Sequence, residues 1–267
     1  MNKDSLGDRM KQYENCYRIY LPHNSAIIVR CDMRAGHTFT KGFARPYDKL
    51  FASCMWETAR QLCKNISGCK IGYTQSDEIT LVLTDYENPK TEPWFSNNLQ
   101  KIVSISASMA TLFFNEEFRK SVGYEALHTF DTETETAHTK ALTTRMALFD
   151  SRAFLVPREE VFNVLYWRQL DCVRNSIQLL GQAHFSHKQL QNKNQNDIQE
   201  MLFQEKNINW ANEPNWFKNG VTIYRKPIEI DNSPNCSFSE STIRNKWCVD
   251  LETPIFTKDR NYITQHI

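Results

Sequence analysis

Residues 69–83 read CKIGYTQSDEITLVL and decide the fold. Two apolar runs flank the polar tip Gln75-Ser76-Asp77-Glu78, a pattern typical of a β-hairpin. A further carboxylate, Asp32, directly follows another apolar run at 25–31, which predicts a short buried strand. Carboxylates delivered by strand ends can hold a pair of divalent cations. The hairpin tip and Asp32 therefore predict the position of a functional site as well as the pairing of strands.

The order of the predicted elements indicates the fold class. They are, in sequence, a strand at 25–31, an amphipathic helix at 47–66, strands at 69–73 and 79–83, a helix at 97–118 and a strand at 147–156 closed by Pro157. This order is the ferredoxin-like split βαβ plan. We therefore expect an α+β fold, an antiparallel sheet packed with helices. In it the first strand lies beside the hairpin, so that Asp32 and Asp77 converge.

The remaining segments predict an extension of this core. A polar, Thr-rich loop is expected at 123–144 and a third helix at 159–180, with Gly181 as its C-terminal cap. Short helical pieces at 189–199, a strand at 221–224 and a flexible loop at 231–246 follow. The predicted divisions are a palm-like catalytic core at 1–158, an α/β extension that completes the catalytic domain at 159–230, and a C-terminal segment with the flexible loop at 231–267.

Composition limits the classes of protein that fit. The chain has 267 residues with 40% hydrophobic and 24% charged residues, the balance of a soluble globular protein. Its formal net charge is +1, so nucleic-acid binding requires a local basic face. The eight cysteines form no Cys-x-x-Cys pair, which favours reduced thiols over a zinc site. We expect no membrane span and a cytoplasmic location, with mitochondria left open as the alternative.

The acidic residues at the strand ends are the candidate catalytic and metal-binding residues. Asp32 alone is equally explained as a loop residue after a strand, and Asp77 as a common turn residue. Adjacent Asp77 and Glu78 repel each other, however, and a bound cation relieves that repulsion. Because hard carboxylate oxygens without a His or Cys partner suit magnesium, Mg²⁺ is the predicted metal.

Cations near this site predict where a polyphosphate would bind. Arg34, Lys41 and Arg45 surround His37 within a short stretch, and Lys101 on the second helix could reach the same anions. Taken singly, His37 is equally explained as a surface or core histidine and Lys101 as a solvated lysine.

Polar residues in the second half of the chain are candidates for contact with RNA. Arg168, Arg174 and Asn175 lie on the third helix, and Arg152 lies in the fourth strand. A salt-bridged structural helix face is the alternative. His187, Lys188 and Lys193 form a possible RNA-backbone patch, for which an ordinary polar loop is the alternative.

The chain resembles the tRNA-histidine guanylyltransferase superfamily, and within it the guanylyltransferase-like branch of 3'-to-5' RNA polymerases. The motifs that carry the resemblance run in order along residues 4 to 226: DSLGDRMKQYE (4–14), RCDMRAGHTF (30–39), FARP (43–46), YTQSDEI (73–79), Lys101-x-x-Ser104, FDSR (149–152), WRQLDC (167–172) and NINW (207–210).

The resemblance implies a polymerase palm that adds nucleotides to the 5' end of tRNA. ATP or GTP first activates the 5'-monophosphate, and the 3'-hydroxyl of the incoming nucleotide then attacks. Asp32, Asp77 and the backbone carbonyl of Met33 are implied ligands of two Mg²⁺ ions, and Glu78 supports them. Nucleotide or triphosphate contacts are implied for Arg34, His37, Arg45, Asp48, Ser76 and Lys101. The family also implies a homotetramer, a dimer of dimers.

Departures from the family pattern select the predicted branch. Met33 and Gly36 stand where the family usually has a glycine and an aromatic residue. Val173-Arg174-Asn175-Ser176 stands where histidine-tRNA guanylyltransferases read His-Ile-Asn-Asn. We therefore predict template-dependent repair or editing of truncated tRNA 5' ends. The alternatives are addition of a single G to histidine tRNA, a non-catalytic tRNA-binding palm and, more distantly, a nucleotidyl cyclase.

Overall fold

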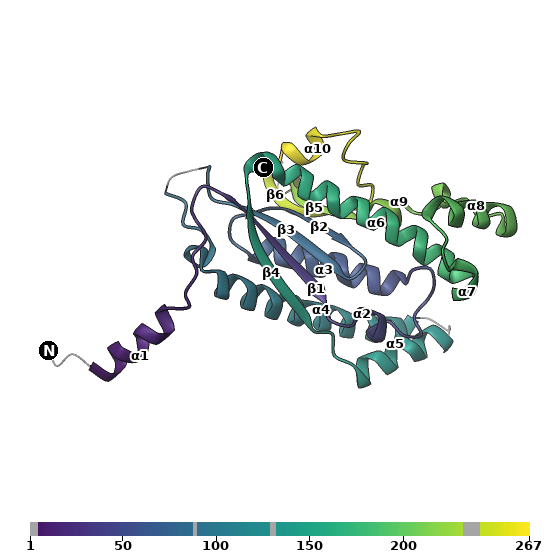
Figure 1. Ribbon diagram of the computed structural model, residues 1–267, viewed down its shortest axis with the longest axis horizontal. Helices are drawn as coiled ribbons and strands as arrows, with labels where there is room; N and C mark the ends of the chain where they lie inside the picture. The colour runs from purple at the N-terminus through teal and green to yellow at the C-terminus, as the bar shows by residue number, and fades with distance from the viewer. Residues whose placement is uncertain (1–4, 88–89, 129–131, 232–240) are drawn as a thin grey trace.

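The computed structural model describes residues 5–87, 90–128, 132–231 and 241–267 (Figure 1). Six strands form one antiparallel sheet in the order β4-β1-β3-β2-β5-β6. The first four positions confirm the ferredoxin-like arrangement and the predicted α+β fold. The strands are β1 (Ala26–Met33), β2 (Cys69–Gln75), β3 (Glu78–Thr84), β4 (Phe149–Val156), β5 (Val221–Asp231) and β6 (Ser241–Asp250).

Helices cover both faces of this sheet (Figure 1). One face packs on α3 and α4, and the other packs on α6. The α-helices are α1 (Ser5–Asn15), α2 (Gly36–Phe39), α3 (Lys49–Asn65), α4 (Leu99–His128), α5 (Thr132–Thr144), α6 (Val161–His184), α7 (His187–Leu190), α8 (Gln195–Lys206), α9 (Asn215–Asn219) and α10 (Asn261–Thr264). The short 3-10 helices are η1 (Trp94–Asn97), η2 (Arg158–Glu160) and η3 (Trp210–Asn212).

Alternation along β1 divides its side chains between these two cores. Val29 and Cys31 are buried against the α3 and α4 side, while Ala26 and Ile28 belong to the core beneath α6. Because successive side chains of a strand point to opposite faces, Asp32 lies on the α6 side. The strand is longer than predicted, so Asp32 lies within the paired part of β1, near its end, rather than after it.

The predicted loop at 123–144 is wrong. The helix expected to end at residue 118 continues as α4, and α5 follows it. The low helix propensity of threonine is only a weak preference. It is overcome here because Ala141 and His138 are both buried against the core.

Two further boundaries differ from the expectation because tertiary contacts decide them. Gly181 lies inside α6 and does not cap it; a Cβ there would lie 2.8 Å from Cγ2 of Ile198, so the glycine permits α8 to pack closely. The expected loop at 231–246 is partly wrong, because β6 begins at Ser241 and pairs with β5; residues 232–240 lie outside the described residues.

Gly220 illustrates how β5 is held against β2. Its φ is +76°, and a Cβ there would lie 2.3 Å from the hydroxyl oxygen of Tyr73. That hydroxyl donates a hydrogen bond to the carbonyl of Asn219 at 2.8 Å, within the buried core. The turn into β5 therefore requires a residue without a side chain.

We predict that Gly220→Ala lowers the free energy of unfolding by roughly 2–4 kcal/mol, since it adds both backbone strain and a clash with Tyr73. Gly123→Ala is the matched control. Gly123 lies in α4 with no atom within 4 Å of an added Cβ, so this change should raise stability by about 0.5–1 kcal/mol. Urea unfolding of both variants measures the difference, and equal midpoints would contradict the assignment.

Candidate active site

A row of three carboxylates crosses the sheet at the end of β1. The register places Glu78 on β3 and Asp150 on β4 directly opposite Asp32. Like charges in this position repel each other. Glu78 is compensated by two buried guanidinium groups, because its carboxylate lies 2.7 Å from Nε of Arg168 and 3.6 Å from Nε of Arg30.

Asp32 is the least compensated carboxylate of the row. Asp150 lies 3.1 Å from Arg152, but no hydrogen bond or ion pair reaches the Asp32 side chain from any residue that the structure describes. Burial raises the pKa of Asp32 to about 6, and the neighbouring negative charges, Asp77 first, act in the same direction. The site thus holds a half-buried carboxylate with no hydrogen bond or ion pair to the described residues, although the charge of Arg152 partly offsets the repulsion.

Asp77 is held beside Asp32 by the geometry of the hairpin turn. Ser76 adopts a positive φ of 50°, and the Asp77 carbonyl accepts a hydrogen bond from the backbone N–H of Met33 at 3.1 Å. Gly36 packs against the carboxylate itself: a Cβ at this position would lie 2.1 Å from Oδ2 of Asp77. The glycine that departs from the family pattern is therefore needed for this placement of Asp77.

These residues fit a divalent cation that takes part of its ligands from a substrate. Among the described residues, no group of three or more His, Cys, Asp or Glu side chains is placed to hold a metal. Asp32 and Asp77 nevertheless provide uncompensated hard oxygen donors at the same strand ends. Magnesium is commonly bound through one or two carboxylates, with phosphates and waters completing its shell. The residues expected to hold Mg²⁺ are Asp32, Asp77 and the Met33 carbonyl.

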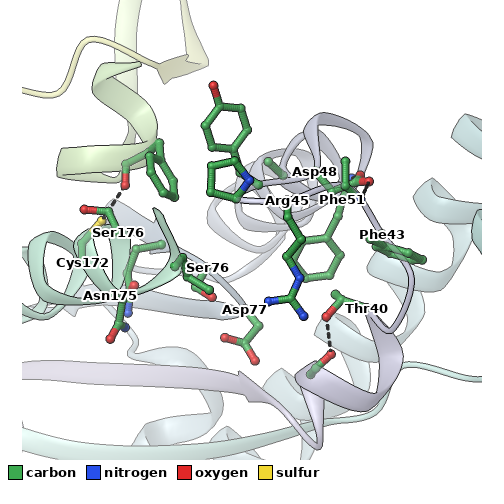
Figure 2. A pocket seen from close by; sticks show the side chains of 18 of the residues that line it. Thr40, Phe43, Arg45, Asp48, Phe51, Ser76, Asp77, Cys172, Asn175 and Ser176 are labelled. Carbon is green, nitrogen blue, oxygen red and sulfur yellow. Dashed lines mark hydrogen bonds between the residues drawn. The ribbon is translucent and has the colours of Figure 1, made fainter. Parts of the chain in front are cut away.

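A cavity of about 380 Å³ opens beside Asp77. Its walls come from α2, the segment before α3, the β2–β3 turn, α6 and α9. Figure 2 shows the Arg45 guanidinium and the Asp77 carboxylate directed toward the same space. The cavity thus combines an exposed cation with a carboxylate, as binding of a metal–polyphosphate complex requires. The structure brings six of the predicted site residues to its lining: His37, Arg45, Asp48, Ser76, Asp77 and Asn175.

Two predicted phosphate-binding residues lie outside this lining. Arg34 is exposed beyond the end of β1. Lys101 lies near the start of α4, where its Nζ is 5.7 Å from the centre of the Phe95 ring. Thr111, about ten residues further along α4, accepts a hydrogen bond from the backbone N–H of Phe149, at the level of the site. The helical rise places Lys101 about 15 Å from that level.

Asp48 lines the cavity, but its carboxylate is occupied by structural contacts. Oδ1 accepts a hydrogen bond from the Phe51 N–H at the start of α3, and Oδ2 accepts one from the Ala44 N–H. His138 Nε2 lies 2.9 Å from Oδ2. Burial opposes ionisation of Asp48, but these hydrogen bonds outweigh it and lower its pKa. Asp48 therefore shapes the loop that carries Arg45.

The predicted RNA-contacting residues divide into buried and exposed groups. Arg168 is buried and ion-paired to Glu78 and Asp171, so the structure corrects its expected role: it supports the acidic row and cannot face RNA. Arg174 is exposed and pairs with Asp171, while Asn175 reaches the cavity wall. The other predicted residues are exposed: Arg152, His187, Lys188 and Lys193.

Sequence reasoning missed an aromatic wall on the far side of the cavity. The ring centres of Tyr47 and Trp216 lie 4.9 Å apart, and those of Trp56 and Trp216 lie 5.2 Å apart. Phe217 also contacts Tyr47, at 4.8 Å. The available signal was the aromatic pair Trp216-Phe217 within a polar, Asn-rich stretch. Only the packing of α9 against α6 and β2, with Trp216 against Trp56 of α3, brings these rings to the same pocket.

The length and apolar character needed to cross a membrane are found in no helix of the described parts of the chain.

Comparisons with known proteins point to one family. The pattern of the tRNAHis guanylyltransferase (Thg1) family matches residues 7–157. The uncharacterized protein R259 of Acanthamoeba polyphaga mimivirus is 30% identical over 248 residues, covering 89% of this chain and 83% of that protein. Two structures of a bacterial tRNA(His) guanylyltransferase (Thg1)-like protein, in complex with ATP and with GTP, are 43% and 41% identical to this chain.

Those two structures have TM-scores of 0.82 and 0.78, and each alignment covers 98% of this chain and 99% of theirs. The family match spans more than half of the chain and includes both carboxylates of the hairpin tip and Asp32. The chain therefore belongs to the tRNAHis guanylyltransferase family.

Proposed function

We propose that this protein is a nucleotidyltransferase that adds nucleotides to the 5' end of truncated tRNA, in the 3'-to-5' direction and guided by the opposing strand. The observation that carries the proposal is the half-buried Asp32 beside Asp77, which lines a cavity of about 380 Å³. The related bacterial Thg1-like protein has been solved with ATP and with GTP, which supports nucleoside triphosphates as ligands of this cavity.

The reaction would proceed in two steps at this site. The 5'-phosphate of the RNA attacks the α-phosphorus of ATP or GTP, so that a nucleoside monophosphate is transferred to it and pyrophosphate leaves. The 3'-hydroxyl of the incoming nucleotide then attacks the activated 5'-phosphate and releases the nucleoside monophosphate. Mg²⁺ held by Asp32 and Asp77 would lower the pKa of the attacking group and neutralise charge on the leaving phosphate.

The side chains of the protein would bind and orient the reactants. Arg45 and His37 lie where they can contact the triphosphate, and the aromatic wall at Trp216 offers an apolar surface to the base. Burial raises the pKa of Glu78, and the ion pairs with Arg168 and Arg30 act in the opposite direction. Glu78 in turn raises the pKa of Asp32, and a cation bound at Asp32 would relieve that repulsion.

The segment Val173–Ser176 favours templated repair over histidine-tRNA identity. Asn175 lies on the cavity wall, and Ser176 accepts a hydrogen bond from the Trp210 indole at 3.0 Å. Ser176 therefore has a structural contact in place of an RNA contact. The experiment is extension, with labelled NTP, ATP and Mg²⁺, of tRNA lacking its first nucleotide, beside full-length histidine tRNA. Extension restricted to histidine tRNA would defeat the proposal of templated repair.

Removing either site carboxylate should abolish extension. We expect Asp32→Asn and Asp77→Asn to lower the rate about 10³-fold or more, because each loses an anionic ligand without a change in size. Glu205→Gln, an exposed acid on α8, is the control and should keep the wild-type rate. Single-turnover extension of the truncated tRNA is the measurement; wild-type rates in both variants would overturn the site.

Gly36→Ala should lower extension roughly 10²-fold, because its Cβ would displace the Asp77 carboxylate from its position. The Mg²⁺ concentration needed for half-maximal extension should rise in the same variant. Gly123→Ala provides the same chemical change in open space and should leave the rate unaltered. The measurement is the extension rate across a range of Mg²⁺ concentrations. An unchanged rate and Mg²⁺ dependence in Gly36→Ala would show that Asp77 does not depend on this contact.

The raised pKa of Asp32 predicts how stability varies with pH in EDTA. A carboxyl whose folded pKa exceeds its unfolded value favours the folded state most when protonated, and this advantage is lost as pH rises through about 6. Asp32→Asn should therefore unfold at a higher temperature than wild type at pH 7.5, with the difference shrinking by pH 5. Thermal unfolding at both pH values measures it; a constant difference would contradict the assigned cause.

A further inference from the structure

An exposed tryptophan lies close to the acidic row, outside the cavity just described. Trp167 projects from α6 with 47% of its surface exposed. The centre of its ring lies 4.3 Å from Cζ of Arg168 and 5.5 Å from Cζ of Arg30. Arg30 is two residues before Asp32 on the same face of β1, a separation of about 7 Å along the strand. An exposed aromatic ring therefore lies beside the proposed catalytic carboxylates.

The guanidinium groups of Arg168 and Arg30 cover one face of the Trp167 ring. Both bind the carboxylate of Glu78, so they approach Trp167 from the same, inner side. That side is closed, since Arg168 is buried and Arg30 nearly so. No other aromatic ring stacks on Trp167 among the residues that the structure describes. The outer face of the ring is accordingly open to solvent.

The surroundings of the open face suit the end of a nucleic acid. Arg152 lies directly opposite Arg30 on β4, and its side chain is half exposed on the same side of the sheet. A guanidinium there can bind a phosphate while the indole stacks on a base. Leu170, one turn further along α6, is also exposed. Arg152 and the exposed indole of Trp167 therefore both lie beside Arg30, two residues from Asp32 on β1.

We propose that Trp167 is a stacking platform for an unpaired base at the end of the RNA substrate, with Arg152 contacting the adjoining phosphate. This inference rests on the proposed function and adds to it the residue that positions the RNA end. Free nucleotide has a separate site, because Trp167 does not line the cavity beside Asp77. Arg30, beside Trp167, precedes Asp32 on β1, whereas Gly36, in the cavity lining, follows it. We therefore expect the two reactants to meet at the acidic row.

The test uses an RNA hairpin with a recessed 5' end that carries one 2-aminopurine. The fluorescence of 2-aminopurine is quenched when its base stacks on an aromatic ring. The label is placed either at the 5'-terminal nucleotide or at the unpaired nucleotide opposite it, without Mg²⁺ or NTP. Wild type should quench one of these labels. Trp167→Leu, which still covers the guanidinium groups, should abolish that quenching and weaken RNA binding about 5- to 100-fold. Trp167→Phe should retain most of both.

Controls separate stacking from a structural role. Phe203→Ala removes an aromatic ring that is 52% exposed on α8 and should match wild type. ATP binding by calorimetry should be the same in Trp167→Leu and wild type. Equal quenching and RNA affinity in Trp167→Leu and wild type would overturn the platform, as would parallel loss of ATP binding. Quenching of free 2-aminopurine riboside triphosphate through Trp167 would assign the ring to nucleotide and also overturn it.

Extension of the same hairpin by wild type is measured separately, with NTP, ATP and Mg²⁺. Extension without Trp167-dependent quenching would defeat the platform alone. Trp167-dependent quenching without extension would defeat the proposed activity alone. The two proposals therefore fail by different observations.

Discussion

Repulsion among carboxylates on three neighbouring strands is the constraint on which the site depends. The β4-β1-β3 register brings Asp150, Asp32 and Glu78 into one row. Arginines from the sheet and from α6 offset the outer two charges. Asp32 in the centre has a raised pKa because it is partly buried and lies beside Asp77, Glu78 and Asp150. A folded protein that leaves this charge uncompensated is prepared to bind a cation, and α6 is fixed above the sheet by the same ion pairs.

Close packing of the backbone then determines where the second carboxylate points. Gly36 leaves room for Asp77, and the Met33 amide holds the turn that carries it. The same turn forms one wall of the cavity, and the aromatic residues of α9 line it as well. A small change in any of these segments would alter both the spacing of the carboxylates and the shape of the cavity. This coupling explains how two departures from the family pattern remain compatible with an intact site.

Much of the palm could be predicted from sequence because its signals are local. The hairpin follows from two apolar runs around a polar tip, and the helices follow from their apolar periodicity. The roles of residues are harder to predict where their contacts come from distant parts of the chain. The motif around Lys101 predicts a contact with phosphate, but Lys101 lies near the start of α4, away from the site. Arg168 was assigned to RNA, although burial against Glu78 gives it a structural role. The Thr-rich α5 was missed because burial of Ala141 and His138 outweighs propensity.

Patterns within short segments of the sequence were enough to predict the strand order, the convergence of Asp32 with the hairpin tip and the family. The electrostatic environment of Asp32, the room that Gly36 leaves for Asp77 and the exposure of Trp167 could be seen only in the folded chain. The physical reason is that exposure and electrostatic environment are properties of contacts between distant segments. The sequence gives the chemical type of each residue, but the segments that pack against a residue determine how far it is exposed to water.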